Sequence, residues 1–554
     1  MVALGDLDVL IVDCQATGAT PALGALLEVG WTTARAGRAA APVTCHRVAL
    51  PPGESIPRMV SRITGIENGD LADAIAPDDA WRRLRAASPS AGKAAPTVIH
   101  FARFELAFLR DLHARFDPES PFPFEIVCAH EIARRVLPDL PRRGLRALAG
   151  YFGHGLKLER RSAGHVEATA QVWQHLAAEL SAKGVESWSE LLTWLEAPAP
   201  ASTNRRAYPM PRARRLSLPD APGVYRMLRS NGDVLYVGKA ASLRKRVSSH
   251  FTHGARTGER ALEMLTQARD LDFTPTATPL EAALLECDEI KRHDPPYNVQ
   301  LRQQDRLAWF ASRDLAHAAP QPDADHGLGP LPSRHALSPL AAARALVSGA
   351  PPTAALRGRS LRVPPPFAPE EQVFAAGWAS FADRHLAPVR SRTSWGALLK
   401  ASCALVQQGI VEEDDEDADA PQGWDEDRVR RHLERGIASG AQLLRRARWL
   451  CLLGDCSVAW REPGADVRRV VVVAGAEIAA ARDLDPDEPL PASPGAGRAW
   501  RDRQRSFDAA RYDRMRVLAT ELKRVLAMGG TVAIRVDARH VLEGAALARL
   551  VRGV

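Results

Sequence analysis

The fold of residues 218–301 is decided by two phrases, Pro222-Gly223-Val224-Tyr225 and Leu235-Tyr236-Val237-Gly238-Lys239. Each phrase contains a short run of β-favouring residues, and the dipeptide Asn231-Gly232 lies between the two runs. Asn-Gly is the strongest short-range signal of a tight hairpin turn. We therefore predict that residues 224–228 and 234–237 are the two strands of a β-hairpin.

Two helices are predicted to follow this hairpin. The first has Ser242 as its N-cap, with Leu243, Val247 and Phe251 spaced along one face. The second begins at Thr278-Pro279-Leu280-Glu281, where threonine and glutamate have the spacing of a capping box and proline takes the first helical position. This second helix is expected to continue to about residue 293.

The second predicted helix carries a carboxylate in an unusual place. Glu286 shares one helical face with Ala282, Ala283 and Ile290. A carboxylate flanked by apolar side chains requires a cation or a hydrogen-bond partner. Glu286 is therefore a candidate metal ligand.

Other polar side chains of the segment suit phosphodiester chemistry. Tyr225 and Tyr236 lie on neighbouring strands of the predicted hairpin, so their phenols can converge, and Arg246 can supply positive charge to a phosphate. Phenols, an arginine, Lys239 and one carboxylate make a plausible phosphodiester-cleaving set. A small α/β domain with buried tyrosines and one salt bridge would show the same spacing, so the spacing alone leaves both interpretations open.

The same residues resemble a GIY-YIG nuclease domain, in the form found in bacterial excinuclease C and its shorter homologue Cho. The positions that carry the resemblance, in order, are Gly223-Val224-Tyr225, Tyr236-Val237-Gly238, Lys239, Arg246, Glu286 and Asn298. The resemblance implies hydrolysis of one DNA strand with a single Mg²⁺ or Mn²⁺ ion held by Glu286. The other roles that it implies are action near the attacking water for Tyr236 with Lys239, phosphate contacts for Arg246 and Tyr225, and closure of the site by Asn298.

The charge of the chain points to a polyanionic partner. The net charge is +7, and residues 203–302 alone contain 17 Lys and Arg against 11 Asp and Glu. Most of the excess therefore lies on the nuclease-like segment and the residues before it, which suits DNA. A basic surface that only keeps the protein dissolved would give a similar excess. The residues that we expect to contact DNA are Arg212, Arg214, Arg215, Arg244 and Lys245.

The first 190 residues alternate between strand and helix patterns, which predicts an α/β domain with a mixed sheet. The expected strands are residues 9–13, 26–32, 43–50 and 98–100, and the expected helices are residues 78–87, 104–116 and 165–183. Three phrases in this region resemble the DEDDh exonuclease domain, the proofreading fold of the DNA polymerase III epsilon subunit. They are Asp13-Cys14-Gln15-Ala16-Thr17-Gly18, His100-Phe101-Ala102-Arg103-Phe104-Glu105 and Glu167-Ala168-Thr169-Ala170-Gln171-Val172-Trp173.

The catalytic residues that this second resemblance implies are mostly replaced. The family holds two metal ions with four carboxylates and activates water with a histidine. Here Asp13 is retained, but Gln15, Glu105 and His165 occupy the other three acid positions, and Arg160 falls at or near the histidine position. An amide and an imidazole cannot replace two anionic ligands of hard cations. We predict that the domain keeps its fold, has lost catalysis, and holds DNA or docks a partner.

The rest of the chain carries weaker signals. Residues 191–216 read as a Pro/Ala/Arg-rich linker, and residues 306–554 read as an accessory region of helical patterns followed by a small α+β part, with residues 501–528 as one long helix. The acidic run at 412–419 reads as a solvated loop, and Cys451 and Cys456 read as buried small hydrophobes. We find no helix-hairpin-helix pair and no second nuclease triad, so one incision is expected.

The whole sequence is interpreted as a multidomain α/β and α+β protein. Its expected parts are a degenerate exonuclease-like domain at 1–190, a linker at 191–216, a GIY-YIG nuclease domain at 217–305 and an accessory region at 306–554. Seven scattered cysteines and the absence of a long apolar run favour the cytoplasm and no membrane association.

The function expected from these parts is a metal-dependent endonuclease that makes a single-strand incision in damaged or distorted duplex DNA, as in nucleotide excision repair. By resemblance, the excinuclease A and B proteins are its possible partners. A 3′→5′ proofreading-type exonuclease and a non-catalytic DNA-binding adaptor remain as alternatives.

Overall fold

The structure is a computed structural model. It describes residues 2–88, 93–155, 160–199, 206–252, 258–299, 301, 307–357, 369–389, 391, 393–410, 423–544 and 546–547. The chain forms two compact units, one made of Met1–Ala277 with Pro295–Asn298 and the other of Thr278–Asp294 with Val299–Val554. The multidomain α/β and α+β class expected from the sequence is confirmed.

The first unit begins with the predicted mixed sheet. Its strands are β1 (Val9–Ala16), β2 (Leu26–Ala34), β3 (Thr44–Arg47), β4 (Ala95–Ile99) and β5 (Phe124–Cys128), in the order β3-β2-β1-β4-β5. β1 is antiparallel to β2 and parallel to β4. Along β1, Val9 and Ile11 face one apolar cluster and Leu10 and Val12 face another, so both faces of the sheet are buried.

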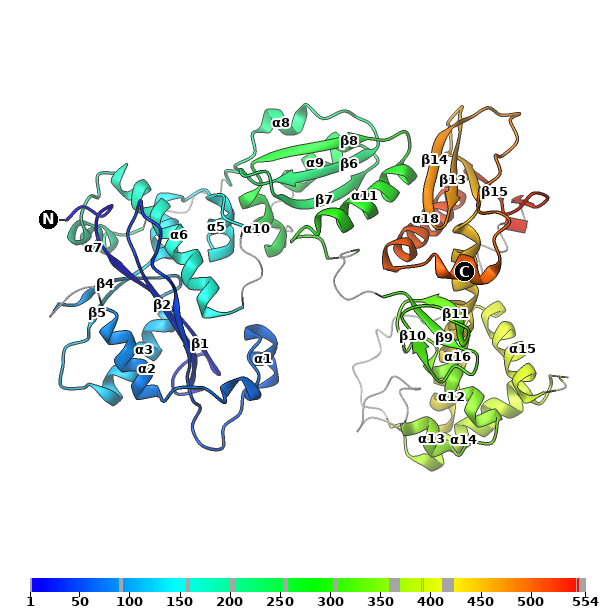
Figure 1. Cartoon of the computed structure of the whole chain (residues 1–554), viewed down its shortest axis with the longest axis horizontal. Coiled ribbons are helices and arrows are strands. Elements are labelled where there is room, and N and C mark those ends of the chain that lie inside the picture. The colour runs from blue at the N-terminus through cyan, green and yellow to red at the C-terminus, as the bar shows by residue number, and fades with distance from the viewer. Residues whose placement is uncertain are drawn as a thin grey trace. The chain divides into compact units, whose positions relative to one another are not determined.

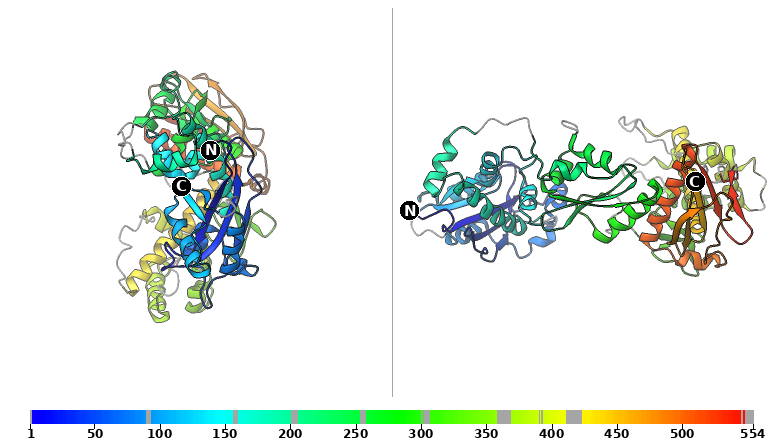
Figure 2. Two further views of the ribbon diagram at one scale, coloured as in Figure 1. Left: turned by 90° about the vertical axis from the view of Figure 1, so that its left-hand side faces the viewer. Right: turned by 90° about the horizontal axis from the view of Figure 1, so that it is seen from above.

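Helices cover both faces of this sheet (Figures 1 and 2). The face of Leu10 packs against α2 (Pro77–Ala86) and α3 (Arg103–Phe116), whereas the face of Val9 packs against α4 (Ala129–Val136), α5 (Leu145–Tyr151), α6 (Ser162–Ser181) and α7 (Trp188–Glu196). Two short elements, α1 (Arg58–Thr64) and η1 (Asn68–Leu71), lie between β3 and α2 in the chain. The expected helices at 78–87, 104–116 and 165–183 correspond to α2, α3 and α6.

The predicted hairpin is the start of a second, three-stranded antiparallel sheet in the same unit. Its strands are β6 (Gly223–Leu228), β7 (Val234–Ala240) and β8 (Asp270–Pro275), in the order β7-β6-β8. Gly232 has φ +88° in the turn, a conformation that glycine adopts without strain. Helices α8 (Arg212–Leu216), α9 (Leu243–Thr252) and α10 (Glu259–Gln267) accompany this sheet.

The region predicted as a linker is partly packed. α7 extends to Glu196, and residues 200–205 lie outside the described residues. Beyond them, the Ala207 amide donates to the Asp139 carbonyl at 2.9 Å, and Met210 is buried in the core of the three-stranded sheet.

The second unit contains α11 (Pro279–His293), the predicted helix that carries Glu286. Its N-cap Thr278 accepts a hydrogen bond from the Glu281 amide, as the sequence pattern indicated. A small sheet follows, made of β9 (Trp309–Ser312), β10 (Ala318–Ala319) and β11 (His326–Leu331). It packs with a helical layer whose members are α12 (Ser338–Val347), α13 (Pro352–Arg357), α14 (Glu371–Phe381), η3 (Ala382–Leu386), α15 (Ser394–Gln407) and α16 (Glu426–Leu453).

The last part of the second unit is the predicted small α+β region. Its antiparallel sheet, in the order β14-β13-β12-β15-β16, consists of β12 (Ser457–Arg461), β13 (Arg468–Ala474), β14 (Glu477–Leu484), β15 (Thr531–Arg535) and β16 (Val541–Glu543). Cys451 and Cys456 are buried in its core, as predicted. The acidic run at 412–419 lies outside the described residues.

One predicted helix of this region is wrong. Residues 501–528 form two helices, α17 (Trp500–Arg505) and α18 (Ala509–Ala527), and not one. The break occurs because Asp508 is an N-cap whose carboxylate accepts a hydrogen bond from the Arg511 amide at 2.8 Å. Among the helices of the described residues, none combines the length and the hydropathy that crossing a membrane requires.

Helix α11 is fixed to α18 by a buried ion pair. The Lys291 ammonium lies 2.7 Å from the Asp513 carboxylate, and their side chains are only 8% and 1% exposed. A second pair, Arg514 with Asp288, is also 2.7 Å long, but its carboxylate side chain is 40% exposed. Arg469 of β13 pairs with Glu281 at the other end of α11. The orientation of α11 within the second unit is therefore held at several points.

We expect Asp513→Ala to destabilise the second unit by about 3–5 kcal/mol, because it leaves the Lys291 ammonium buried without its partner. Asp288→Ala, which removes the more exposed carboxylate, should cost only about 1 kcal/mol. Urea unfolding of the full chain, followed by tryptophan fluorescence, measures both. Equal decreases in the free energy of unfolding for the two variants would contradict the larger contribution assigned to the buried Lys291–Asp513 pair.

Candidate active site

Three aromatic side chains of the first unit meet beside the hairpin. Tyr225 comes from β6, Tyr236 from β7 and His250 from α9, and their ring centroids are 5.8–6.0 Å apart. The Tyr225 hydroxyl lies 2.7 Å from Nε2 of His250, within hydrogen-bond distance. The structure thus brings the two predicted phenols together and adds an imidazole that the sequence interpretation missed.

The glycine of the second phrase makes room for this cluster. In the register of the hairpin, Tyr225 pairs with Gly238. A Cβ at position 238 would lie 2.5 Å from the Tyr225 hydroxyl oxygen, so any larger residue would displace the phenol. Tyr225 is fully buried, and its position is therefore set by packing.

Asn298 contacts the strand that carries Tyr236. Its side-chain oxygen accepts from the Val237 amide at 3.0 Å, and its side-chain nitrogen donates to the Val237 carbonyl at 2.9 Å. Because β7 is an edge strand, these bonds satisfy backbone groups that its sheet leaves unpaired. In this structure, the Asn298 amide group orders the strand beside Tyr236.

The two predicted cations of the cluster lie on the same unit and reach its surface. Lys239 follows Gly238 on β7, Arg246 lies on α9, and both residues are exposed. From such positions, long cationic side chains can reach the phosphates of a bound strand.

Glu286 lies on α11 in the second unit and is half-buried. One side of α11 packs against the C-terminal part, through Leu280, Glu281, Leu284, Asp288 and Lys291. At about 100° per residue, these positions lie between about 120° and 220° around the helix from Glu286. Glu286 therefore points away from α18. A single carboxylate fits a Mg²⁺ or Mn²⁺ site, because such ions keep several waters and need only one or two protein oxygens.

The degenerate exonuclease-like positions also come together. His165 of α6 places Nδ1 3.3 Å from one oxygen of Asp13, and the Gln15 side chain contacts the other oxygen at 3.4 Å. Glu105 of α3 is buried nearby; burial first, and then the charge of Asp13, raises its pKa from 4.5 to about 8. At neutral pH this carboxyl is mostly protonated.

This donor set does not fit a two-metal centre. Its members are two carboxyl groups, one amide and one imidazole, whereas two hard cations need several anionic oxygens. Burial also lowers the pKa of the adjacent His100 to about 3, so that ring stays neutral. In the described part of the chain, no group of three or more His, Cys, Asp or Glu residues is arranged to hold a metal ion.

An ion pair between a buried carboxylate and a partly exposed arginine, which the sequence did not reveal, anchors the helix of His165. The Glu28 carboxylate of β2 is completely buried, pairs with Arg161 and accepts a hydrogen bond from the Ser162 amide at 2.8 Å. The carboxylate thereby satisfies an amide that the first turn of α6 leaves without a helical acceptor. The start of the helix that carries His165 is therefore well anchored.

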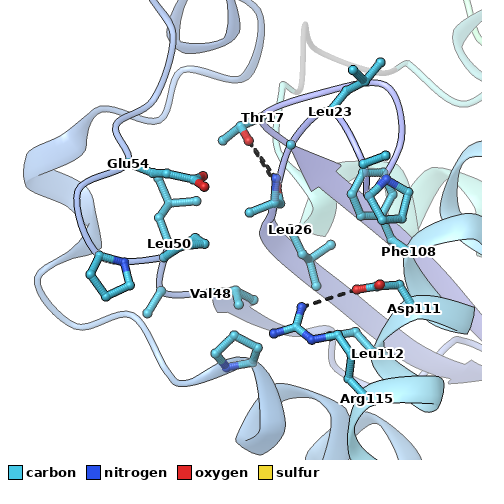
Figure 3. Close-up of a pocket in the computed structure, with 18 of the residues that line it drawn as sticks. Thr17, Leu23, Leu26, Val48, Leu50, Glu54, Phe108, Asp111, Leu112 and Arg115 are labelled. Atoms are coloured by element: carbon cyan, nitrogen blue, oxygen red, sulfur yellow. Dashed lines mark hydrogen bonds and ion pairs between the residues drawn. The ribbon is translucent and has the colours of Figure 1, made fainter.

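A cavity of about 860 Å³ in the first unit lies apart from both sets of residues (Figure 3). Its walls come from the loop before β2, the segment after β3 and the later turns of α3, where Asp111 and Arg115 form an ion pair of 3.3 Å. Glu105 lies in the first turn of α3 and does not line this cavity. The cavity is therefore distinct from the exonuclease-like positions.

The five residues predicted to contact DNA are gathered on α8 and α9, and most already make protein contacts. Arg214 pairs with Asp270 at 2.8 Å, Arg215 lies over the Phe251 ring at 4.0 Å, and Lys245 is 3.7 Å from Asp220. Arg244 donates to the Leu218 carbonyl at 2.7 Å, and Arg212 is exposed. A DNA phosphate would compete with these contacts, which are mainly at the surface.

Comparison with known proteins defines the class of the central segment. Residues 221–299 match the UvrC-like GIY-YIG domain. UvrABC system protein C of Sphingopyxis alaskensis is 49% identical over 96 residues, which cover 17% of this chain and 15% of that relative. A crystal structure of the GIY-YIG N-terminal endonuclease domain of UvrC from Thermotoga maritima, bound to magnesium, is 32% identical and covers 16% of this chain and 94% of that one, with a TM-score of 0.15.

A longer match extends beyond this domain. A Mycobacterium tuberculosis (strain CDC 1551 / Oshkosh) protein named as a bifunctional exonuclease/endonuclease is 31% identical over 419 residues, which cover 73% of this chain and 62% of that relative. The predicted resemblance, an exonuclease-like domain fused to a GIY-YIG domain, is confirmed. The chain spans about three fifths of the mycobacterial relative and less than a quarter of the UvrABC system protein C relatives.

The raised pKa of Glu105 predicts that the free energy of unfolding of the wild type falls as the pH rises, and that Glu105→Gln removes this pH dependence. Folding keeps the proton on this carboxyl, so the wild type loses stability as the pH rises from about 4.5 to about 8, by on the order of 5 kcal/mol. In EDTA, the free energy of unfolding of Glu105→Gln relative to that of the wild type should therefore increase over this pH range. Denaturant unfolding at several pH values measures the difference. If Mg²⁺ removes the difference, the site still binds metal and our interpretation of its ligands is wrong.

Proposed function

We propose that this protein is a metal-dependent DNA endonuclease that cuts one strand with its GIY-YIG domain. The observation that carries the proposal is the cluster of Tyr225, Tyr236 and His250 on a segment that matches the UvrC-like GIY-YIG domain. A domain that only bound DNA would not need two phenols and an imidazole packed together on elements that also carry the exposed Lys239 and Arg246.

The role proposed for each residue follows from the chemistry of its side chain. Tyr236 is assigned to the attacking water, with Lys239 stabilising negative charge nearby, and Arg246 is assigned to the phosphate. The hydrogen bond between Tyr225 and His250 orients both groups and allows a proton to move between oxygen and nitrogen. Glu286 is assigned to one Mg²⁺ or Mn²⁺ ion, which would supply Lewis-acid stabilisation of the phosphate oxygens.

Under this proposal the exonuclease-like domain does not cleave DNA. A 3′→5′ exonuclease of this type needs a two-metal centre, and Gln15 and His165 do not supply the anionic oxygens expected at two of its four acid positions. The proofreading alternative is therefore the weaker one. The adaptor alternative requires tight DNA binding without any cleavage.

The substrate and partners are proposed by similarity. Relatives named UvrABC system protein C match the GIY-YIG segment, which supports a single-strand incision, with 5′-phosphate and 3′-hydroxyl ends, in damaged or distorted duplex DNA. The excinuclease A and B proteins would present that DNA. The cysteines, none of which forms a disulfide, suit a reducing cytoplasm.

The decisive experiment compares Glu286→Ala and Asp13→Ala on labelled duplexes, intact or carrying a bulky adduct, with Mg²⁺ or Mn²⁺ and with or without excinuclease A and B. Glu286→Ala should reduce nicking at least about 10³-fold, because the ion loses its carboxylate. Asp13→Ala should nick like the wild type. Asp288→Ala, a control on the same helix as Glu286, should also nick like the wild type. Nucleotide release abolished by Asp13→Ala would instead establish the exonuclease, and binding without product would establish the adaptor.

The role of His250 can be tested separately. We expect His250→Phe to reduce the single-turnover cleavage rate about 10²-fold, since it keeps an aromatic ring but removes the partner of the Tyr225 hydroxyl. His540→Phe, at a site 72% exposed in the C-terminal region, is the control and should have no effect. An unchanged rate and pH profile for His250→Phe would remove the imidazole from the mechanism.

A further inference from the structure

The exonuclease-like domain makes a fitted contact with the nuclease domain inside the first unit. Just before α5, the Arg142 amide donates to the Thr266 hydroxyl of α10 at 3.1 Å, and its guanidinium pairs with Glu259 at 2.7 Å. One turn later, Arg146 lies 3.5 Å from the Glu263 carboxylate and 4.8 Å from the centre of the Tyr297 ring. The two domains therefore share a polar and aromatic seam along α5 and α10.

Small residues allow this close approach. A Cβ on Gly150 of α5 would overlap the Gln267 side chain, and a Cβ on Gly155 would lie 2.7 Å from the Arg229 guanidinium. Arg269 packs over the Tyr151 ring at 4.1 Å and donates to the Tyr151 carbonyl at 3.1 Å. Packing of this closeness holds the two surfaces in one arrangement.

The seam leads through Tyr297 to the strand of Tyr236. The buried Tyr297 hydroxyl donates to Glu263 at 2.6 Å and accepts from Gln267. The Tyr297 amide donates to the Leu235 carbonyl at 3.1 Å, and the next residue, Asn298, bonds both backbone groups of Val237. Leu235 and Val237 are the two neighbours of Tyr236, so this segment fixes the outer edge of β7 on both sides of the candidate catalytic phenol.

We infer that the exonuclease-like domain is a structural part of the endonuclease, with Arg146 as the positioning residue that holds Tyr297, and through it Asn298 and Tyr236. This inference rests on the proposed function for its catalytic consequence. Its physical basis is that an edge strand paired on one side only is weakly constrained, and that Tyr297 and Asn298 supply the missing constraint.

The contact of Arg146 is suited to this role. Its side chain is 20% exposed, and two of its guanidinium nitrogens have no hydrogen-bond partner in the described part of the chain, so its charge is balanced by Glu263 and the face of Tyr297. A desolvated guanidinium over an aromatic face gains more than an exposed one. Burial also raises the pKa of Tyr297 well above its usual value, so the phenol remains a hydrogen-bond donor at working pH.

The test compares Arg146→Ala with Arg135→Ala in the full chain. Arg135 is a matched control, since it also pairs with a carboxylate, Glu131, and lies over an aromatic ring, Trp194, but has no contact with the nuclease domain among the described residues. Arg146→Ala should lower the kcat of nicking about tenfold with little change in KM, and Arg146→Lys should recover part of it. Arg135→Ala should leave both constants unchanged even if it lowers the melting temperature.

A second readout does not depend on nuclease activity. Amide hydrogen exchange of residues 235–238, without DNA or metal, should become faster in Arg146→Ala and stay unchanged in Arg135→Ala. Unchanged exchange in Arg146→Ala, or the same acceleration in Arg135→Ala, would overturn the inference. If the wild type makes no nick but Arg146→Ala still accelerates exchange, the proposed function fails while the positioning contact stands.

Discussion

The nuclease domain is built on a three-stranded sheet whose edge strands are paired on one side only, and contacts with other parts of the chain help to hold its elements. Its strands are short, β7 is an edge strand, and small domains bury a low fraction of their surface. Elements from outside the domain compensate. The segment around α5 packs against α10 within the first unit, and α18 packs against α11 within the second.

The contact with α10 gives the exonuclease-like domain a structural role beside the nuclease domain of the first unit. Gln15 and His165, the two non-acidic residues at the predicted acid positions, contact the Asp13 carboxylate directly. The features that hold the fold are intact, among them the buried Glu28–Arg161 pair at the start of α6. Under the proposed function, the domain acts through its core and its seam with α10 and does not need a metal centre.

Local sequence signals predicted the elements that depend on local chemistry. Asn231-Gly232 set the hairpin, and the Thr278–Pro279 pair set the start of α11. Of the elements that were missed, one depends on a distant contact and one on a local cap. β8 has a partly exposed, acidic pattern and is a strand because β6 lies beside it, whereas Asp508 divides α17 from α18 by capping. His250 left a readable signal, since it continues the Leu243–Val247 face of α9 at helical spacing.

The sequence could not indicate what orients Glu286, because the answer lies more than two hundred residues away. An α-helical side chain points where the rotation of its helix directs it. The residues of α11 that meet α18 and β13 occupy the side opposite Glu286. The buried Lys291–Asp513 pair tolerates little rotation, because turning the helix by one residue would separate the two charges and leave both buried without a partner. The C-terminal region, in which no chemistry could be recognised, therefore determines the direction of the carboxylate assigned to the metal ion.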